Sequence, residues 1–481
     1  MITGYKPVKQ GEFIREICLT YDLVITIMED GLILYFGEVM TMLFMKNTFK
    51  GGAAVPHRKN TADMETVKMG VPEKVIIPML QHIGAPCEPV VKKGDTVKVG
   101  QLIGNSDKFV SAPIHSSVSG TVANIAPMLY PGGFHVTTVE IKTDGKQEVH
   151  EDIKPPQYSN NKEFLQAVRA SGLVGLGGAG FPAHIKLGPP PDKKIDTLIV
   201  NGAECEPYIT SDYREILENS WNIMTGINIL MEVLGVENVW IGIEDNKPLA
   251  IKELTHLAAT SDRINVVKLK SRYPQGAEKM LIYSTTGRRV PPGKLPMDVG
   301  VIVMNVNSVS FISEYIKTGM PLIKRRVTVD GVAVKNPSNV EVLIGTQLSD
   351  VFDFCGGFDA VVHKVLMGGP MMGIAQHSLQ TSVVKHTNAL LAFNRDEARL
   401  DAEGPCIRCG RCVRTCPMNL MPLHINMHSL KENVDELNRY HTNDCIECGS
   451  CSFVCPAKRH LVQSIRLAKL QLRQAASKGG K

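Results

Sequence analysis

Eight of the twelve cysteines lie between residues 406 and 455, in two runs of identical spacing. Residues 406–417 and residues 445–456 both fit the pattern C-x2-C-x2-C-x3-C-P. Three thiolates at this spacing cover one face of an iron–sulfur cubane, and the fourth cysteine of each run reaches the other cluster. Structural zinc instead prefers paired C-x2-C knuckles. The spacing therefore predicts two 4Fe–4S clusters.

The crossed pattern assigns four cysteines to each cluster. The first set is Cys406, Cys409, Cys412 and Cys455, and the second set is Cys445, Cys448, Cys451 and Cys416. Each run contains a glycine, Gly410 or Gly449, that gives the loop room to turn around the inorganic sulfurs. Clusters that share ligand segments lie close together, which favours one-electron transfer over substrate chemistry.

A glycine-rich loop at residues 175–182 is the second candidate for chemistry. It contains Gly175, Gly177, Gly178 and Gly180. Such glycines expose backbone N–H groups to a phosphate, and Lys186 could neutralise the phosphate charge. The loop follows a helical pattern at 164–170, so it is not the dinucleotide-binding motif, which follows a strand. Phosphate binding and a plain turn both fit these residues.

Polar residues follow the apolar strand predicted at 197–200. Ligands gather at the carboxyl ends of strands in α/β folds, where Asn201 and Glu204 could bind flavin or ribose hydroxyls. A solvated acidic loop is the alternative. Cys205 lies between two acids, so we expect a raised thiol pKa and no nucleophilic role. No Ser/His/Asp grouping or carboxylate pair is apparent, which argues against hydrolysis.

Several domains must position these residues, because 481 residues exceed one core and suggest roughly three to four domains. The apolar fraction of 43% and the charged fraction of 21% are typical of globular proteins. A net charge of +5 with only two Trp argues against nucleic-acid binding. Acidic residues interrupt the apolar stretch 23–44, so no membrane span is predicted. We expect a reducing compartment, with any membrane contact made through partners.

The fold class that we predict is multidomain α/β. Residues 1–44 are an unassigned extension, and Met45 resembles a natural start. Residues 45–150 read as a barrel-sandwich domain like those that carry lipoyl or biotinyl groups, in which Lys108 is either a modified lysine or an ordinary surface one. Residues 151–322 alternate helices and strands and predict an α/β domain with a largely parallel sheet. A β-grasp-like module at 323–385 follows.

An α-helical double-cluster domain is predicted at 386–470, followed by a basic tail at 471–481. Apolar residues recur at helical spacing after residue 457, and basic residues lie between them, which predicts an amphipathic helix. The apolar positions are Leu461, Ile465, Ala468 and Leu472. This helix could contact anionic lipid or an acidic partner, or it could pack its apolar side on the cluster domain.

Four motifs resemble the NADH-oxidising, FMN-binding subunit of respiratory complex I. They are residues 175–186, 201–214, 273–278 and 305–308. Together with residues 81–86, 244–247, 368–373 and the double cluster motif, they look more specifically like the RnfC subunit of the Rnf complex, a membrane-bound ferredoxin:NAD oxidoreductase. The resemblance runs from about residue 49 to residue 469 and implies a complex I-like flavin domain and an SLBB-type β-grasp module.

The resemblance also implies a set of cofactor contacts. FMN would be held by Gly175, Gly177, Gly178, Gly180, Lys186, Asn201, Glu204, Tyr273, Gly276 and Asn305. Glu206 and Glu278 would lie near the isoalloxazine or the nicotinamide and serve as the catalytic pair. The sequence departs from the complex I pattern at Leu176, Ala277 and Met304, which places the individual NADH contacts in doubt but not the flavin fold.

A flavin must stand between NAD(H), which exchanges hydride, and clusters that take one electron at a time. The resemblance implies a peripheral subunit on the cytoplasmic side of the cell membrane, which exchanges electrons with a membrane-bound partner subunit in either direction. In the energy-conserving direction, electrons arriving from ferredoxin would reduce NAD+ while other subunits move ions. Two other functions remain open: a pure electron carrier with a vestigial flavin site, and the partner of another flavin system such as an amino-acid reductase. A lipoylated carrier is more distant.

Overall fold

The computed structural model describes residues 16–19, 23–28, 31–36, 48–131 and 133–479. Most of the predicted extension 1–44 lies outside these residues. The part of it that is described forms an antiparallel sheet of β1 (Glu16–Leu19), β2 (Leu23–Met28) and β3 (Gly31–Phe36). Within the described ranges, no helix combines the length and the apolar character needed to cross a bilayer.

The barrel-sandwich domain consists of two antiparallel sheets. One has the order β5-β11-β10-β7, with β5 (Lys74–Pro78), β11 (Phe134–Thr143), β10 (Gly120–Tyr130) and β7 (Thr96–Val97). The other has the order β6-β8-β9, with β6 (Glu88–Pro89), β8 (Leu102–Asn105) and β9 (Ile114–His115). Val75, Ile103 and Ile141 belong to the fully buried core of this domain. Lys108 is exposed between β8 and β9.

A parallel four-stranded sheet forms the centre of the α/β domain. Its order is β14-β13-β12-β15, with β14 (Ile264–Leu269), β13 (Asn238–Glu244), β12 (Thr197–Gly202) and β15 (Val301–Asn305). The strands are apolar on both faces because helices cover both, as expected of a parallel sheet. The surrounding helices are α1 (Asn161–Ala170), α2 (Ala183–Leu187), α3 (Ser211–Glu218), α4 (Ser220–Leu234), α5 (Pro248–Ala258), α6 (Glu278–Thr286), η1 (Pro296–Val299) and α7 (Val306–Thr318).

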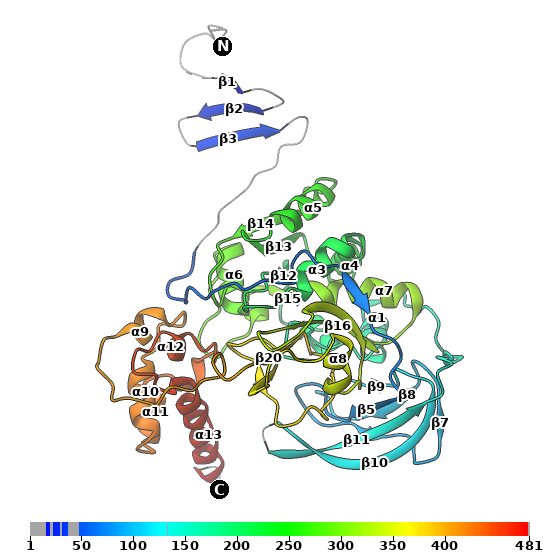
Figure 1. Ribbon diagram of the computed structural model, residues 1–481. Coiled ribbons are helices and arrows are strands. Elements are labelled where there is room, and N and C mark those ends of the chain that lie inside the picture. The colour runs from blue at the N-terminus through cyan, green and yellow to red at the C-terminus, as the bar shows by residue number, and fades with distance from the viewer. Residues whose placement is uncertain (1–15, 20–22, 29–30, 37–47, 132, 480–481) are drawn as a thin grey trace.

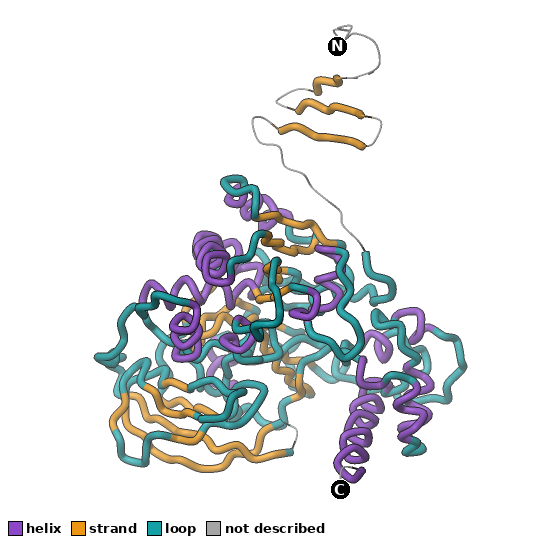
Figure 2. Tube along the Cα trace, turned by 180° about the vertical axis from the view of Figure 1, so that it is seen from behind, coloured by secondary structure: helices purple, strands orange, loops and turns teal. Residues whose placement is uncertain are grey.

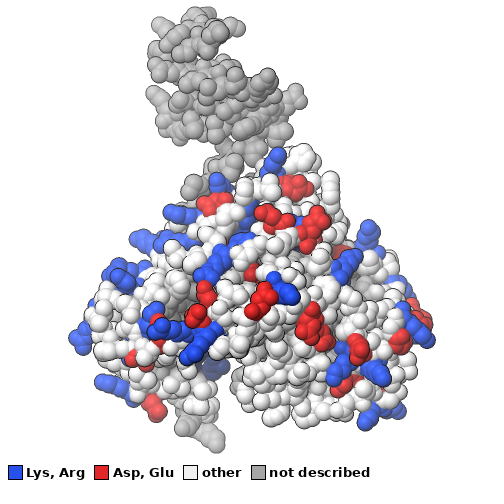
Figure 3. All heavy atoms as spheres, in the orientation of Figure 1, with Lys and Arg blue, Asp and Glu red and all other residues white. Residues whose placement is uncertain are grey.

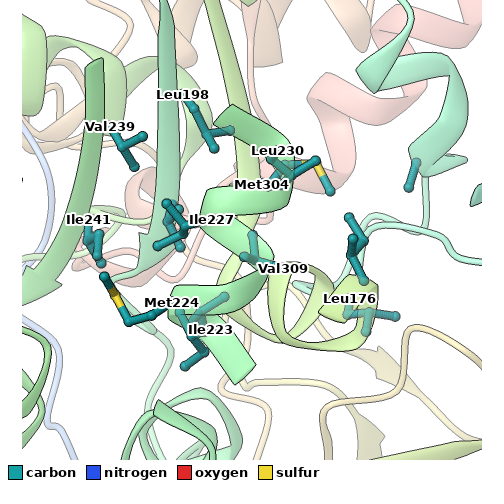
Figure 4. Packing of buried hydrophobic residues seen from close by; sticks show 14 of the residues in the cluster. Leu176, Leu198, Ile223, Met224, Ile227, Leu230, Val239, Ile241, Met304 and Val309 are labelled. Carbon is teal, nitrogen blue, oxygen red and sulfur yellow. The ribbon is translucent and has the colours of Figure 1, made fainter. Parts of the chain in front are cut away.

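Alternate residues of the strands pack into two separate hydrophobic cores, one on each face of the sheet. Leu198 and Val239 pack on one face against α4 and α7, whereas Ile199 packs on the other face with side chains of α6. This alternation follows from the two-residue period of a strand. Figure 4 shows Ile227 of α4 among the side chains of the first core, which Leu176 of the glycine-rich loop joins. The loop is therefore anchored in the main core.

A six-stranded sheet contains the predicted β-grasp module. Its order is β19-β18-β20-β16-β17-β4, and α8 (Leu348–Phe354) packs against it. The strands are β19 (Ile374–Ala375), β18 (Lys364–Met367), β20 (Ala389–Phe393), β16 (Lys324–Asp330), β17 (Ser338–Leu343) and β4 (Thr66–Lys68). The sheet extends beyond the predicted limits 323–385, because β4 joins one edge from far upstream and β20 follows residue 385.

The C-terminal domain is helical, as predicted, and lies to one side of the molecule (Figures 1 and 2). Its elements are α9 (Arg411–Thr415), α10 (Pro422–Ser429), α11 (Val434–Arg439), η2 (Thr442–Asp444), α12 (Ser450–Phe453) and α13 (Leu461–Gly479). Leu461, Ile465, Ala468 and Leu472 of α13 are buried in the core of this domain. The apolar side of the predicted amphipathic helix therefore packs on its own domain.

Residues 48–65, here called the strap, cross the molecule between the cluster domain and the six-stranded sheet (Figure 1). At one end Gly52 hydrogen-bonds to Thr415 of α9, and at the other β4 continues the strap into the sheet beside β17. Between these points His57 accepts a hydrogen bond from the backbone of Tyr208 in the α/β domain. Over the face drawn in Figure 3, basic and acidic side chains are interspersed, which agrees with the small net charge of +5.

The packing in Figure 4 predicts the effect of a core truncation. Ile227→Ala removes a side chain of 0% exposure between α4 and the sheet, and it should cost about 2–5 kcal/mol of stability through lost burial and a cavity. The calorimetric transition that contains the α/β domain should shift to lower temperature. Trp221→Ala, at 71% exposure on the same helix, is the control and should change little. Equal shifts for both variants would contradict the packing argument.

Candidate functional site

The glycine-rich loop lies between α1 and α2 and is closed by its own backbone. Gly175 N–H donates to Phe181 O at 2.8 Å, and Gly180 N–H donates to Gly175 O at 3.2 Å. Gly178 has a φ of +121°, and a β-carbon there would meet nothing within 4 Å. A β-carbon on Gly177 would lie 3.1 Å from Nδ2 of Asn305. The loop therefore leaves open space beside the strand ends, of the kind a bound phosphate needs.

The carboxyl ends of β12 and β15 bring the predicted asparagines together. Asn201 stands opposite Asn305 in the parallel register, and its Nδ2 donates to Gly276 O at 2.9 Å. Asn305 caps α7 by accepting from Asn307 N at 3.0 Å, and its Nδ2 donates to Asp212 at 2.7 Å. The glycine loop, Asn201, Gly276 and Asn305 therefore share one edge of the sheet.

Lys186 and Glu278 form an ion pair across this edge. Nζ of Lys186 lies 2.6 Å from Oε1 of Glu278, and each side chain is about one third exposed, at 33% and 37%. The sequence predicted separate roles for them, as phosphate counter-charge and as a catalytic carboxylate, and gave no sign of this pairing. An ion pair this exposed contributes little stability and is readily exchanged, so Lys186 stays available to an anion.

Glu204 has one satisfied and one unsatisfied carboxylate oxygen. Its Oε1 accepts from Asp212 N at 2.6 Å, whereas its buried Oε2 lies 3.9 Å from the Lys59 ammonium and has no hydrogen-bond partner among the described residues. Burial raises the pKa of Glu204 to about 7, and the nearby Lys59 ammonium opposes that rise. A buried polar oxygen without a partner is costly unless a ligand supplies a donor. The hydroxyl groups predicted to face Glu204 fit this oxygen.

Lys59 is the residue that sequence reasoning missed. Its ammonium donates to the carbonyl oxygens of Glu204 at 2.9 Å, Glu206 at 2.9 Å and Ile209 at 2.5 Å. The loop so bound contains two non-glycine residues in the left-handed region, Glu204 at φ 50° and Tyr208 at φ 68°. Such conformations are uncommon and require support from their surroundings. No local motif marks a strap lysine 145 residues before the loop that it holds.

Glu206 faces a neighbouring loop. Its carboxylate accepts from Met371 N at 3.0 Å and from Met372 N at 2.9 Å, in the segment 368–373 that carried part of the family resemblance. Burial raises the pKa of Glu206 to about 7, and these two N–H groups counteract the rise. Both oxygens are therefore engaged in joining two loops. Its predicted place near the isoalloxazine stays a prediction.

The surroundings of Leu176 account for one departure from the complex I pattern. Leu176, which replaces an arginine of that pattern, is 1% exposed and belongs to the core. A buried guanidinium reaches the same loop from β16, where Nη2 of Arg325 donates to Leu176 O at 3.3 Å.

Burial raises the pKa of Cys205 to about 12, and its sulfur accepts from Gly276 N at 3.4 Å. The prediction that Cys205 is no nucleophile agrees with this environment.

The eight clustered cysteines fall into two spatial groups. Cys416 lies with Cys445, Cys448 and Cys451 around one small apolar hollow. Cys412 lies close enough to Cys406 and Cys455 that negative charge on either raises its pKa. Cys409 is exposed in the loop between Cys406 and Cys412. No three or more of these side chains are arranged to hold a metal ion within the part of the chain that the structure describes, so the crossed ligand sets stay a prediction.

Crowded thiols disfavour their own ionisation. Burial raises the pKa of Cys445 to about 11, and neighbouring sulfurs add to the rise. The pKa of Cys451 is raised further, by burial and then by the charges of Cys445, Cys448 and Cys416. Only a cation can hold several thiolates this close, because it replaces their mutual repulsion with attraction. The donor set therefore suits a thiophilic cation, of which iron is one.

The two groups differ in exposure. Cys416, Cys448 and Cys451 are buried beside the α/β domain, where the hydroxyl of Tyr273 donates to Cys448 O at 2.6 Å. Cys406 and Cys409 are exposed. Tyr273 therefore contacts the cluster domain through its hydroxyl, although the sequence placed it among the flavin contacts. Below, the two groups are called the buried set and the surface set.

Family models cover most of the chain. The RnfC barrel sandwich hybrid domain matches residues 47–146, and the Nuo51 FMN-binding domain matches residues 168–314. The SLBB domain matches residues 326–375, and the 4Fe-4S dicluster domain matches residues 405–458. These matches, with the mixed α/β architecture, confirm the predicted multidomain fold class.

Two curated relatives match nearly end to end. The subunit designated C in the proton-translocating ferredoxin:NAD(+) oxidoreductase complex of Clostridium ljungdahlii is 47% identical over 90% of this chain and 96% of its own length. Its counterpart in the Na(+)-translocating ferredoxin:NAD(+) oxidoreductase complex of Acetobacterium woodii is 46% identical over 90% of this chain and 98% of its own. Among solved structures, an air-oxidized NAD+-reducing [NiFe]-hydrogenase aligns at a TM-score of 0.47 with 19% identity, over 65% of this chain and 63% of that one.

An FMN-binding domain joined to a 4Fe–4S dicluster domain defines a flavin- and iron–sulfur-dependent oxidoreductase subunit. The glycine loop, the strand-end asparagines and the grouped thiols are the elements that such a protein requires. The chain belongs to the RnfC family, whose members are subunits of the Rnf ion-translocating ferredoxin:NAD+ oxidoreductases. The family predicted from the sequence motifs is confirmed.

The contacts of Lys59 predict its effect on flavin binding. Lys59→Met removes the donor to three carbonyls, so the loop that carries Glu204 should relax and FMN should bind roughly tenfold more weakly, a change of about 1.4 kcal/mol. The measurement is the dissociation constant of FMN by fluorescence titration of flavin-depleted protein. Lys68→Met, at an exposed lysine just beyond the strap, is the control. Unchanged affinity in Lys59→Met would show that the loop needs no ammonium.

Proposed function

We propose that this chain is the subunit of an Rnf complex in which NAD(H) meets FMN, and that it exchanges electrons between NAD(H) and the rest of the complex. The activity of the complex is ferredoxin:NAD+ oxidoreduction coupled to ion translocation, as the names of the relatives state. One observation carries the proposal: the flavin domain contacts the buried cysteine set directly, while the surface set lies open to a partner. In this arrangement the buried set can exchange electrons with the flavin, and the surface set can exchange electrons with a partner.

FMN, when bound, exchanges hydride with NAD(H) and single electrons with iron–sulfur clusters. The residues proposed to hold it are those at the shared sheet edge. They are Gly175, Gly177, Gly178, Gly180, Lys186, Asn201, Glu204, Gly276 and Asn305. In this proposal the loop N–H groups and Lys186 receive the phosphate, while Glu204 accepts from a hydroxyl through its unsatisfied oxygen. Tyr273, which the resemblance also placed among these residues, donates its hydroxyl to Cys448 O in the cluster domain.

We assign roles to the two carboxylates predicted as catalytic according to their contacts. Glu278 is partly exposed and, within the described ranges, forms an ion pair with Lys186 alone, so it is the carboxylate free to approach a nicotinamide. Glu206 is held by Met371 N and Met372 N, so it keeps two loops in register. The proposal therefore gives Glu278 a contact with substrate and Glu206 a positioning role.

The two ligand sets define an inner and an outer cluster. We propose Cys445, Cys448, Cys451 and Cys416 as ligands of the inner cluster, and Cys406, Cys409, Cys412 and Cys455 as ligands of the outer one. The outer loop also carries Arg408, Arg411 and Arg414, all exposed. Basic side chains around an exposed cluster favour an acidic electron-transfer partner. Another subunit of the complex fits this role.

We further propose a peripheral position on the cytoplasmic side of the membrane, reached through other subunits. The apolar side of α13 is used within its own domain, and Lys469 and Arg466 are paired with Glu447. A basic residue such as Arg473, exposed farther along α13, leaves only an auxiliary contact with anionic lipid. Partner subunits therefore supply most of the attachment.

The direct test uses anaerobically purified, cluster-reconstituted protein. We expect about one FMN per chain, and NADH should bleach both the flavin and the cluster absorbance, because the flavin passes electrons singly to the clusters. Clusters without flavin, unreduced by NADH even after FMN is supplied, would leave a simple electron carrier. Co-purification with amino-acid reductase components in place of membrane subunits would place the chain in the other flavin system.

The two ligand sets predict separable losses of iron. Cys451→Ser in the buried set and Cys409→Ser in the surface set should each reduce the iron content from about eight to about four atoms per chain. Cys409→Ser should still allow NADH to reduce the remaining cluster, whereas Cys451→Ser should interrupt that reduction. Cys355→Ser, at a buried cysteine of the β-grasp core, is the control. Loss of NADH reduction in Cys409→Ser alone would reverse the proposed order.

A further inference from the structure

Three parts of the molecule meet at Tyr273, and none of the motif assignments accounts for this junction. Ala53 of the strap pairs with Tyr273 through two backbone hydrogen bonds, Ala53 N to Tyr273 O at 2.8 Å and Tyr273 N to Ala53 O at 3.1 Å. The tyrosine hydroxyl donates to Cys448 O at 2.6 Å. The side chain is among the largest that are fully enclosed, and the residue is 2% exposed. A buried hydroxyl with one well-placed acceptor holds both groups in position.

The strap also forms hydrogen bonds to the segment that carries Cys416, the fourth cysteine of the buried set. Gly52 N donates to Thr415 O at 2.7 Å, and Oγ1 of Thr415 donates back to Gly52 O at 2.6 Å. Thr415 directly precedes Cys416, the ligand contributed by the first cysteine run. The strap is therefore bound on one side to the backbone of Tyr273 and on the other to the turn that presents Cys416.

Two glycines make this close approach feasible. Gly51 and Gly52 both have a φ of +82°, which side chains rarely adopt. A β-carbon on Gly51 would lie 2.7 Å from Cys416 O, and one on Gly52 would lie 2.6 Å from Tyr273 O. Real β-carbons do not approach backbone oxygen atoms this closely. The two residues therefore act as a spacer that only glycine can supply.

We propose that Tyr273 and residues 51–53 form a clamp that positions the buried cluster against the flavin domain, and that the Tyr273 hydroxyl tunes the reduction potential of that cluster. The inference rests on the proposed function, because it assumes a cluster on Cys416, Cys445, Cys448 and Cys451. It assigns Tyr273 a positioning role toward the cluster in place of the flavin contact expected from the family.

The hydroxyl acts through the peptide that follows Cys448. A hydrogen bond to its carbonyl polarises the amide, and it places the positive end of the O–H dipole near the cluster. Reduction adds negative charge to the cluster, so nearby donors favour the reduced state. Tyr273→Phe keeps the ring and its packing but removes the donor. The potential of the inner cluster should therefore become more negative.

The experiment is a redox titration of full-length, cluster-reconstituted Tyr273→Phe, followed by electron paramagnetic resonance. At a fixed potential the ratio of reduced to oxidised inner cluster should fall by up to about tenfold, which corresponds to about 59 mV for one electron. The signal of the surface cluster should not move and serves as an internal control. Cys409→Ser protein, which lacks the surface cluster, identifies the inner signal. Tyr130→Phe removes a hydroxyl that contacts Ser382 in place of a cysteine segment, and it should shift neither signal.

A second variant tests the spacer without changing any hydrogen-bonding side chain. Gly51→Ala should slow electron transfer from reduced flavin to the inner cluster by about tenfold or more in stopped-flow traces, with the FMN content unchanged. Gly70→Ala, where a β-carbon meets nothing within 4 Å, is the matched control.

An unshifted inner cluster in Tyr273→Phe would overturn the tuning role. Equal shifts of both clusters would overturn its specificity, since they indicate general loosening. An unchanged rate in Gly51→Ala would overturn the spacer role. These outcomes are separate from failure of the proposed function, which would appear in the unsubstituted protein as missing flavin or as clusters that NADH does not reduce.

Discussion

The ammonium group of Lys59 is the interaction on which the flavin side of this molecule depends. The loop that follows β12 carries Glu204, a proposed flavin contact, and it contains two residues in the left-handed region. Three of its carbonyl oxygens accept hydrogen bonds from Lys59, and a fourth, that of Ala203, accepts from Lys247 at 2.7 Å. Two cations therefore stabilise a backbone that would otherwise carry unsatisfied oxygens.

Pairing of opposite charges lowers the free-energy cost of burying the lysines and glutamates in this region. Lys247 is paired with the buried Glu244 at 3.4 Å, and Lys59 lies 3.9 Å from Glu204. Burial lowers the pKa of Lys59 to about 8, and it raises that of Glu204 to about 7. Removing one partner of such a set leaves the other charge uncompensated, which is why single changes here are felt more than surface changes. The strap thus supplies one of the two ammonium groups that stabilise this loop, and the α/β domain supplies the other.

The sequence predicted the parts of the site that local patterns encode. Cysteine spacing identified the dicluster domain, and glycines after a helix together with polar residues after strands identified the sheet edge around Asn201 and Asn305. It did not predict the contacts that join these parts. Lys59 to Glu204, Glu206 to Met371 and Tyr273 to Cys448 span 145, 165 and 175 residues, and each involves a loop without periodicity. No spacing rule encodes a contact between irregular segments that far apart. The contacts of the strap therefore could not be predicted from the sequence.

The position of the strap in the chain has a consequence for assembly. Residues 51–53 are made early, yet Gly52 bonds to Thr415, which lies 363 residues later. Closing so long a loop is entropically costly, and the interaction must wait until the C-terminal domain has emerged from the ribosome. The α/β domain and the cluster domain can therefore fold as separate units, each with its own core. The contact between Gly52 and Thr415 is therefore completed last, and a chain truncated before residue 415 would lack it.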